Sequence, residues 1–140
     1  MTEQVYLFLT APKKTKAEIA CQDEKIENLR MMMLPSAIRY DKDKVQTSPQ
    51  DPMIKYIERL SEMEEKRKAL FDRYLSEQDA IEAEINKLDD IYVRQVLTMR
   101  YISCKCWKDI VKQMPFAERA VFKFHKRGIQ LIDANMKSVQ

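Results

Sequence analysis

Glycine is almost absent from this 140-residue sequence, which contains one glycine, five prolines, three cysteines and a single histidine. β-Rich folds need turn residues roughly every eight to twelve positions, so the shortage of glycine and proline excludes most of them. One glycine cannot build a phosphate-binding loop, and no suitably spaced nucleophile accompanies the histidine. These absences predict an all-α protein that is not an enzyme and has no cofactor.

The three cysteines do not have the spacing of a disulfide framework, and their odd number favours a reducing compartment. They are Cys21, Cys104 and Cys106. Together with His125 they would supply four zinc ligands, but a Cys-x-Cys pair is not the usual spacing. No metal site is expected. No apolar run approaches the roughly 18 residues of a membrane span, and the start, MTEQVYLFLT, does not match a signal peptide. We expect a cytoplasmic protein without membrane association.

Charge is distributed unevenly along the chain, although the net charge at pH 7 is only +3. Ten lysines and arginines but only three acidic residues lie between Arg94 and the end, whereas the first 93 residues contain fifteen basic and nineteen acidic side chains. A basic C-terminal third after an acidic remainder is typical of a module that binds a polyanion.

The first third of the chain predicts one helix followed by a linker. Residues 1–14 fit either a short strand or an apolar arm that packs on the protein's own helices, and the arm is favoured. Thr15 and Glu18 match a capping box, which predicts a helix over 15–34. Its stripe contains Ile19, Gln22, Ile26, Leu29 and Met33. Residues 35–52 contain three prolines and no periodicity, which indicates a linker.

Residues 53–88 contain neither proline nor glycine and predict a long, coiled-coil-like helix. One heptad register is apolar at eight of eleven positions: Met53, Tyr56, Leu60, Met63, Arg67, Leu70, Tyr74, Glu77, Ile81, Glu84 and Leu88. A second register is nearly as good: Ile57, Leu60, Phe71, Tyr74, Ile81, Ile85 and Leu88. This wide stripe suits a helical hairpin with 15–34, a dimeric coiled coil, or both. Because a short N-terminal helix cannot cover about fifty ångströms of long helix, pairing between chains is favoured, which predicts a homodimer through 53–88.

Residues 89–140 predict a separate C-terminal helix-turn-helix domain. Residues 1–88 are expected to form a hairpin or coiled-coil oligomerisation region. Asp89 and Asp90 are expected to start a helix that ends near Ile102. A second, short helix follows from the i, i+3, i+4, i+7 spacing of Trp107, Ile110, Val111 and Met114. The third helix is expected from about Ala117 to Asn135.

The third helix has a basic side opposite an apolar side when its residues are placed on a helical wheel. The apolar side contains Ala117, Val121, Phe124, Gly128, Leu131 and Ile132. The opposite side contains Arg119, Lys123, Lys126, Arg127 and Gln130, with Phe122 at the edge. This pattern suits a recognition helix, whose polar side enters the major groove of DNA. It equally fits an amphipathic helix with a solvated basic side, but the short preceding helix and the charge asymmetry favour DNA.

Residues 96–101, 107–110 and 119–132 together resemble the region-four helix-turn-helix of bacterial sigma factors. More closely, they resemble the sigma-like regulators of phages and prophages, the ArpU/RinA kind of late-operon activator. The residues that carry this resemblance are Leu97, Arg100, Tyr101, Trp107, Ile110, Met114, His125, Lys126 and Arg127. Two helix caps depart from the family's pattern: Cys106 stands where Ser or Thr is usual, and Ala117 stands where the recognition helix usually has Ser or Thr.

These observations predict a sequence-specific DNA-binding transcriptional regulator, most simply an activator, of phage or prophage genes in a bacterial host cell. Double-stranded DNA would contact Arg119, Lys123, Lys126, Arg127 and Gln130, with Lys105, Lys108 and Lys112 on phosphates. Host RNA polymerase is a further candidate partner. Two other hypotheses stay open: a phage small terminase subunit that recognises packaging sites, and a coiled-coil protein that binds RNA polymerase or a sigma factor.

Overall fold

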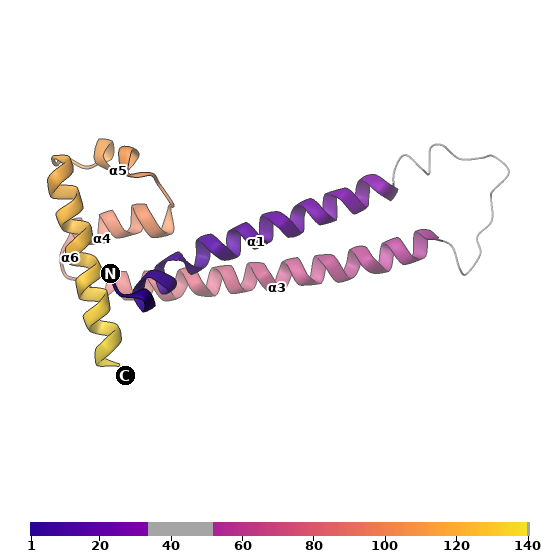
Figure 1. Cartoon of the computed structure of the whole chain (residues 1–140), viewed down its shortest axis with the longest axis horizontal. Helices are drawn as coiled ribbons and strands as arrows, with labels where there is room; N and C mark the ends of the chain where they lie inside the picture. The colour runs from indigo at the N-terminus through magenta and orange to yellow at the C-terminus, as the bar shows by residue number, and fades with distance from the viewer. Residues whose placement is uncertain (34–51, 140) are drawn as a thin grey trace. The chain divides into compact units, whose positions relative to one another are not determined.

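Helices form all the regular secondary structure in residues 1–33 and 52–139, which are the residues described by the computed structural model (Figure 1). In chain order they are α1 (Glu3–Met33), α3 (Pro52–Asn86), α4 (Ile91–Leu97), the π-helix η1 (Thr98–Ile102), α5 (Trp107–Gln113) and α6 (Glu118–Ser138). The all-α prediction is therefore confirmed for this part of the chain. The predicted linker lies outside the described residues except for Pro52, which begins α3. Across the same residues, every helix lacks the length or the apolar character needed to cross a membrane.

Helix α1 corrects the prediction for the N-terminus. Residues 1–14 do pack on the protein's own helices, but as the first turns of α1 rather than as a strand or an arm. The capping box at Thr15 is also wrong, because Thr15 lies inside the helix and is fully buried. A proline inside a helix, here Pro12, costs about 3 kcal/mol, and the burial of Val5 and Leu9 offsets that cost. The buried side of α1 is thus continuous: Val5, Leu9, Pro12, Thr15, Ile19, Gln22, Ile26 and Leu29.

Helix α3 confirms the first heptad register of the sequence. Ile81 and Leu88 are buried, and the other positions of that register are partly buried. Of the residues that belong to the second register alone, Ile57 and Phe71 are 54% and 41% exposed, whereas Ile85 is buried. The apolar stripe of α3 is therefore narrower than the sequence indicates around Ile57 and Phe71 but keeps its width at Ile85.

The chain divides into two compact units, one of Met1–Lys14 with Tyr74–Gln140 and the other of Thr15–Arg73. We call the first the helix-turn-helix unit, after the motif that the sequence predicts there, and the second the hairpin unit. Each unit contains part of α1 and part of α3, and the predicted domain 89–140 lies in the helix-turn-helix unit.

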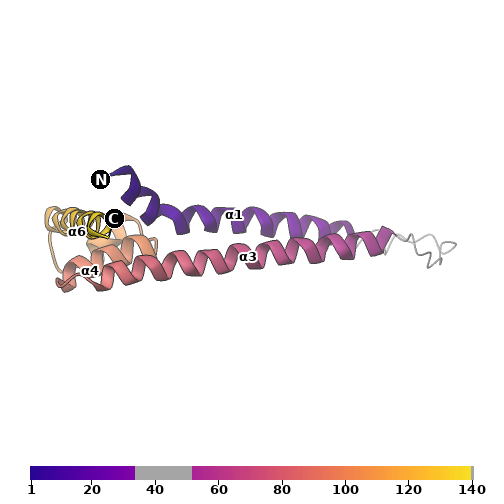
Figure 2. The same cartoon turned by 90° about the horizontal axis from the view of Figure 1, so that it is seen from below.

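In the hairpin unit, α1 and α3 pack side by side (Figure 1 and Figure 2). The amide of Gln22 donates a 3.0 Å hydrogen bond to the carbonyl of Met63. Three ion pairs join the same two helices: Arg30 with Glu64, Arg67 with Asp23, and Arg73 with Glu18. The premise that the N-terminal helix is too short to cover α3 is therefore wrong, because α1 has 31 residues. Pairing within one chain covers the stripe, and the homodimer stays a prediction.

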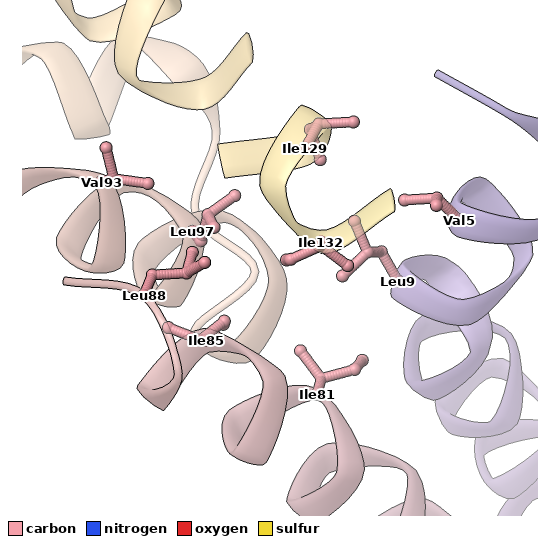
Figure 3. Close-up of a cluster of buried hydrophobic side chains, with 9 residues drawn as sticks. All are labelled: Val5, Leu9, Ile81, Ile85, Leu88, Val93, Leu97, Ile129 and Ile132. Carbon is pink, nitrogen blue, oxygen red and sulfur yellow. The ribbon is translucent and has the colours of Figure 1, made fainter. Parts of the chain in front are cut away.

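The core of the helix-turn-helix unit draws side chains from α1, α3, α4 and α6 (Figure 3). Each buried aliphatic side chain contributes roughly 1.5–3 kcal/mol relative to exposure to water. The cluster consists of Val5, Leu9, Ile81, Ile85, Leu88, Val93, Leu97, Ile129 and Ile132. Helix α6 is thus held by elements that are remote from it in sequence. The hydroxyl of Thr2 adds a 3.0 Å hydrogen bond to the carboxylate of Asp133 on α6.

Gly128 lies where α6 packs closely against α4. A Cβ atom at this position would lie 2.6 Å from Leu97 Cδ1 and 2.9 Å from Val93 Cγ1. Both neighbours are fully buried, so neither can turn away into solvent. The single glycine is thus explained by close helix packing, as expected from its place on the buried side of α6.

We predict that Gly128→Ala lowers the free energy of unfolding by up to about 2 kcal/mol. Alanine improves helix propensity by about 1 kcal/mol, whereas overpacking a dense core costs about 1–3 kcal/mol. Urea denaturation followed by circular dichroism measures the change. Ala134→Gly, at an exposed position of α6, is the control and should cost about 1 kcal/mol through propensity alone. Stabilisation by Gly128→Ala would contradict the close approach.

Candidate nucleic-acid interface

Three consecutive helical segments occupy the region of the predicted helix-turn-helix, and the sequence predicted all three. Helix α4 continues into η1, so the first spans 91–102 against the expected 89–102. The carboxylate of Asp90 accepts hydrogen bonds from the backbone N–H groups of Tyr92 (2.9 Å) and Val93 (3.4 Å), which confirms the expected helix start. Helices α5 and α6 follow close to the predicted bounds.

The connection before α5 is tied down by Lys105 and Arg100. The backbone N–H of Lys105 donates to the carbonyl of Met99 (2.9 Å), and the carbonyl of Lys105 accepts from the guanidinium of Arg100 (3.1 Å). Cys104 adopts a left-handed conformation with φ of 54°, which costs a non-glycine residue roughly 1–2 kcal/mol. Two hydrogen bonds to the neighbouring Lys105 help to hold this strained turn in place.

The turn between α5 and α6 is held by packing, because Ala117, the N-cap of α6, supplies no side-chain hydrogen bond there. The N-cap residues Cys106 and Ala117 make no side-chain capping hydrogen bond, as their sequence implied. Met114, at the end of α5, is buried. Phe116 in the turn packs edge-on against Tyr92 and Phe124, with ring centroids 4.8 Å and 5.1 Å apart. Aromatic contacts therefore set the angle at which α6 leaves the turn.

Helix α6 places all five predicted DNA-contacting residues on its exposed surface. They are Arg119, Lys123, Lys126, Arg127 and Gln130. The buried residues on its other side are Val121, Gly128, Ile129 and Ile132. The helical wheel was wrong at three positions: Ala117 and Leu131 are exposed, and Ile129, which the wheel left out, is buried. The buried side of α6 is turned toward Ile129 because Val5 and Leu9 of α1 also pack there.

Four basic side chains of α6 carry uncompensated charge. Within the residues that the structure describes, Arg119, Lys123, Lys126 and Arg127 form no ion pair. They border two shallow surface hollows. One, of about 470 Å³, is lined by Glu118, Arg119, Phe122, Lys123 and Lys126. The other, of about 460 Å³, is lined by Lys123, Lys126, Arg127, Gln130 and Leu131. An anionic ligand would therefore be attracted to these side chains without first having to break an ion pair within the protein.

The three lysines predicted for phosphate contacts differ in their surroundings. Lys108 and Lys112 lie exposed on α5. Lys105 is partly buried, and its ammonium group donates a 2.7 Å hydrogen bond to the side chain of Gln113. Lys105 therefore has a structural partner that Lys108 and Lys112 lack among the described contacts.

An aromatic layer under the basic surface is the feature that sequence reasoning missed. His125 Nε2 lies 2.7 Å from the Tyr101 hydroxyl, and its ring meets Trp107 edge-on at 4.7 Å. The guanidinium of Arg100 lies over the Trp107 ring at 4.8 Å. Burial and, to a smaller extent, the charge of Arg100 together lower the pKa of His125 to about 4. Burial likewise raises the pKa of Tyr101. His125 is thus a hydrogen-bonded, partly buried histidine.

No family model, curated protein or solved structure matches this chain. The described residues also contain no group of three or more His, Cys, Asp or Glu side chains arranged to hold a metal ion. The functional assignment therefore depends on the geometry and charge of the helix-turn-helix unit.

Acid should destabilise the protein through His125. Its pKa is lowered by folding, so the unfolded chain binds the proton more readily between about pH 6.5 and pH 4. The stability contributed by the neutral ring is complete above pH 6.5 and is lost as the pH falls through that interval.

The measurement is urea denaturation from pH 7.5 to pH 4 for the wild type and for His125→Gln, which keeps a polar partner for Tyr101 but cannot titrate. Carboxylates contribute equally to both proteins, so subtraction isolates His125. Identical pH dependence in the two proteins would show that His125 is not buried as a neutral ring.

Proposed function

We propose that this protein is a sequence-specific DNA-binding transcriptional regulator whose α6 enters the major groove. The observation that carries the proposal is the exposed, unpaired basic side of α6, directly opposite the side buried in the core. An α-helix with side chains is about 10–12 Å across, and the major groove of B-form DNA is about 12 Å wide. Arginine and glutamine pair with base edges through two hydrogen bonds, which suits Arg119, Arg127 and Gln130 to sequence recognition.

Lysines on two elements supply contacts that position the protein. Lys123 and Lys126 on α6, with Lys108 and Lys112 on α5, would meet phosphates along the groove. Lys105 would join them by exchanging its bond with Gln113 for a phosphate. The first helix of a helix-turn-helix crosses the DNA backbone while the second enters the groove, and α5 and α6 take these two roles.

The phage or prophage setting, the role as an activator and the contact with host RNA polymerase rest on the resemblance to sigma-like late-operon regulators. Because α1 packs on the apolar stripe of α3, the proposed homodimer cannot use that stripe. Exposed apolar residues on α3, among them Ile57 and Phe71, would form the contact between chains. Two copies would place two α6 helices on neighbouring half-sites of one DNA duplex.

Removing two basic side chains from α6 should weaken DNA binding by roughly 10- to 100-fold. The variant is Lys123→Ala with Arg127→Ala, and the ligand is a duplex selected by the wild-type protein from a random-sequence library. Lys123 is the phosphate contact that this variant loses, and each lost phosphate contact lowers the steepness of log affinity against log salt by about 0.9, so a drop of about that size is expected. Fluorescence anisotropy at several salt concentrations measures both quantities.

The matched control is Lys16→Ala with Lys66→Ala, which removes the same charge from exposed positions of the hairpin unit. Binding should stay within about twofold of the wild type, since these charges lie outside the proposed interface. Unchanged binding in the α6 variant would overturn the residue assignment. Equal losses in both variants would indicate attraction by net charge alone. Absence of any salt-sensitive duplex binding by the wild type would favour a protein partner instead.

A further inference from the structure

Phe122 is an exposed aromatic side chain among the basic residues of α6. Its side chain is 40% exposed. Phe122 is next to Lys123 in the sequence and lies one helical turn from Lys126. The ring is held on one side by Trp107, with centroids 4.9 Å apart and planes inclined by 52°. The Trp107 ring contacts His125 in turn. The packed tryptophan therefore supports Phe122 in place while leaving much of its ring at the protein surface.

The hollow at Phe122 combines one apolar wall with several cations. Arg119, Lys123 and Lys126 line it together with the ring, and Glu118 is its one acidic residue. A ligand that fits both features must offer negative charge beside a small apolar group. Duplex DNA does so at thymine, because the C5-methyl group projects into the major groove between two phosphate backbones. The remaining base edges in that groove are polar and would leave the phenyl ring without a matching contact.

We propose that Phe122 contacts the C5-methyl group of a thymine and so selects that base at one position of the target site. This inference rests on the proposed DNA-binding function and adds the chemistry that one side chain recognises. Phe122 lies in the second turn of α6, and the N-terminal residues of a recognition helix are those that reach base edges. The lysines beside it would hold the backbone while the ring distinguishes the base.

The test removes a single methyl group from the DNA. A duplex selected by the wild-type protein is resynthesised with each thymine replaced in turn by uracil, which pairs identically but lacks the C5-methyl. Burying one such group favours binding about fourfold. The wild-type affinity should fall by about that factor at one thymine of a half-site and remain within about 1.5-fold at the others.

A second arm identifies the side chain. Phe122→Ala should bind the thymine and uracil duplexes equally, whereas Leu131→Ala should keep the wild-type difference. Leu131 is a suitable control because it is also an exposed apolar residue of α6 but lines the other hollow. Phe122→Leu retains apolar contact and provides an alternative if the alanine variant melts early. Circular dichroism of each variant checks that helicity is preserved.

The possible outcomes distinguish a failure of the role proposed for Phe122 from a failure of the proposed DNA-binding function. Duplex binding without sensitivity to uracil at any position overturns the role of Phe122 and leaves the DNA-binding function intact. An undiminished uracil effect in Phe122→Ala also overturns it. Failure of the wild-type protein to select any duplex overturns the proposed function itself.

Discussion

The contact between α6 and α4 at Gly128 is the constraint on which the candidate interface depends. Leu97 and Val93 lie against the backbone of α6 so closely that a Cβ atom would not fit without displacement. Packing this tight allows one rotation of α6 about its axis, since any other would bring a side chain against α4. The buried side then determines the exposed side. Arg119, Lys123 and their neighbours face solvent because Val121, Gly128 and Ile132 face the core.

Aromatic packing completes what hydrogen-bonded caps would usually supply. Cys106 and Ala117 begin their helices without side-chain caps, which costs each helix about 1 kcal/mol. Phe116 holds the turn by packing on Tyr92 and Phe124. Beneath the basic surface, Trp107 joins Arg100, His125 and Phe122 in contacts that cross from the end of η1 through α5 to α6. Local capping is thus replaced by contacts between elements.

Signals local to the sequence predicted the C-terminal helices well. Asp90 and the spacing after Trp107 lie within a few residues of the structure they cause. The N-terminal prediction was wrong because a capping box is also a local signal, and the burial of Val5 and Leu9 against α3 and α6 outweighs it. The same contact turns Ile129 inward and leaves Leu131 exposed. The exposed basic residues of the candidate site were identified, whereas the aromatic layer was missed because its members are far apart in sequence.

The central claim is that α6, supported by α5, is the surface that meets DNA. Nuclear magnetic resonance tests it directly, by following the backbone amide signals of isotope-labelled protein as a selected duplex is added. The account predicts shifts concentrated in α5 and the exposed side of α6, with signals of Thr15–Met33 and Pro52–Arg73 unchanged in the hairpin unit. Shifts confined to the hairpin unit, or none at saturating duplex, would contradict it.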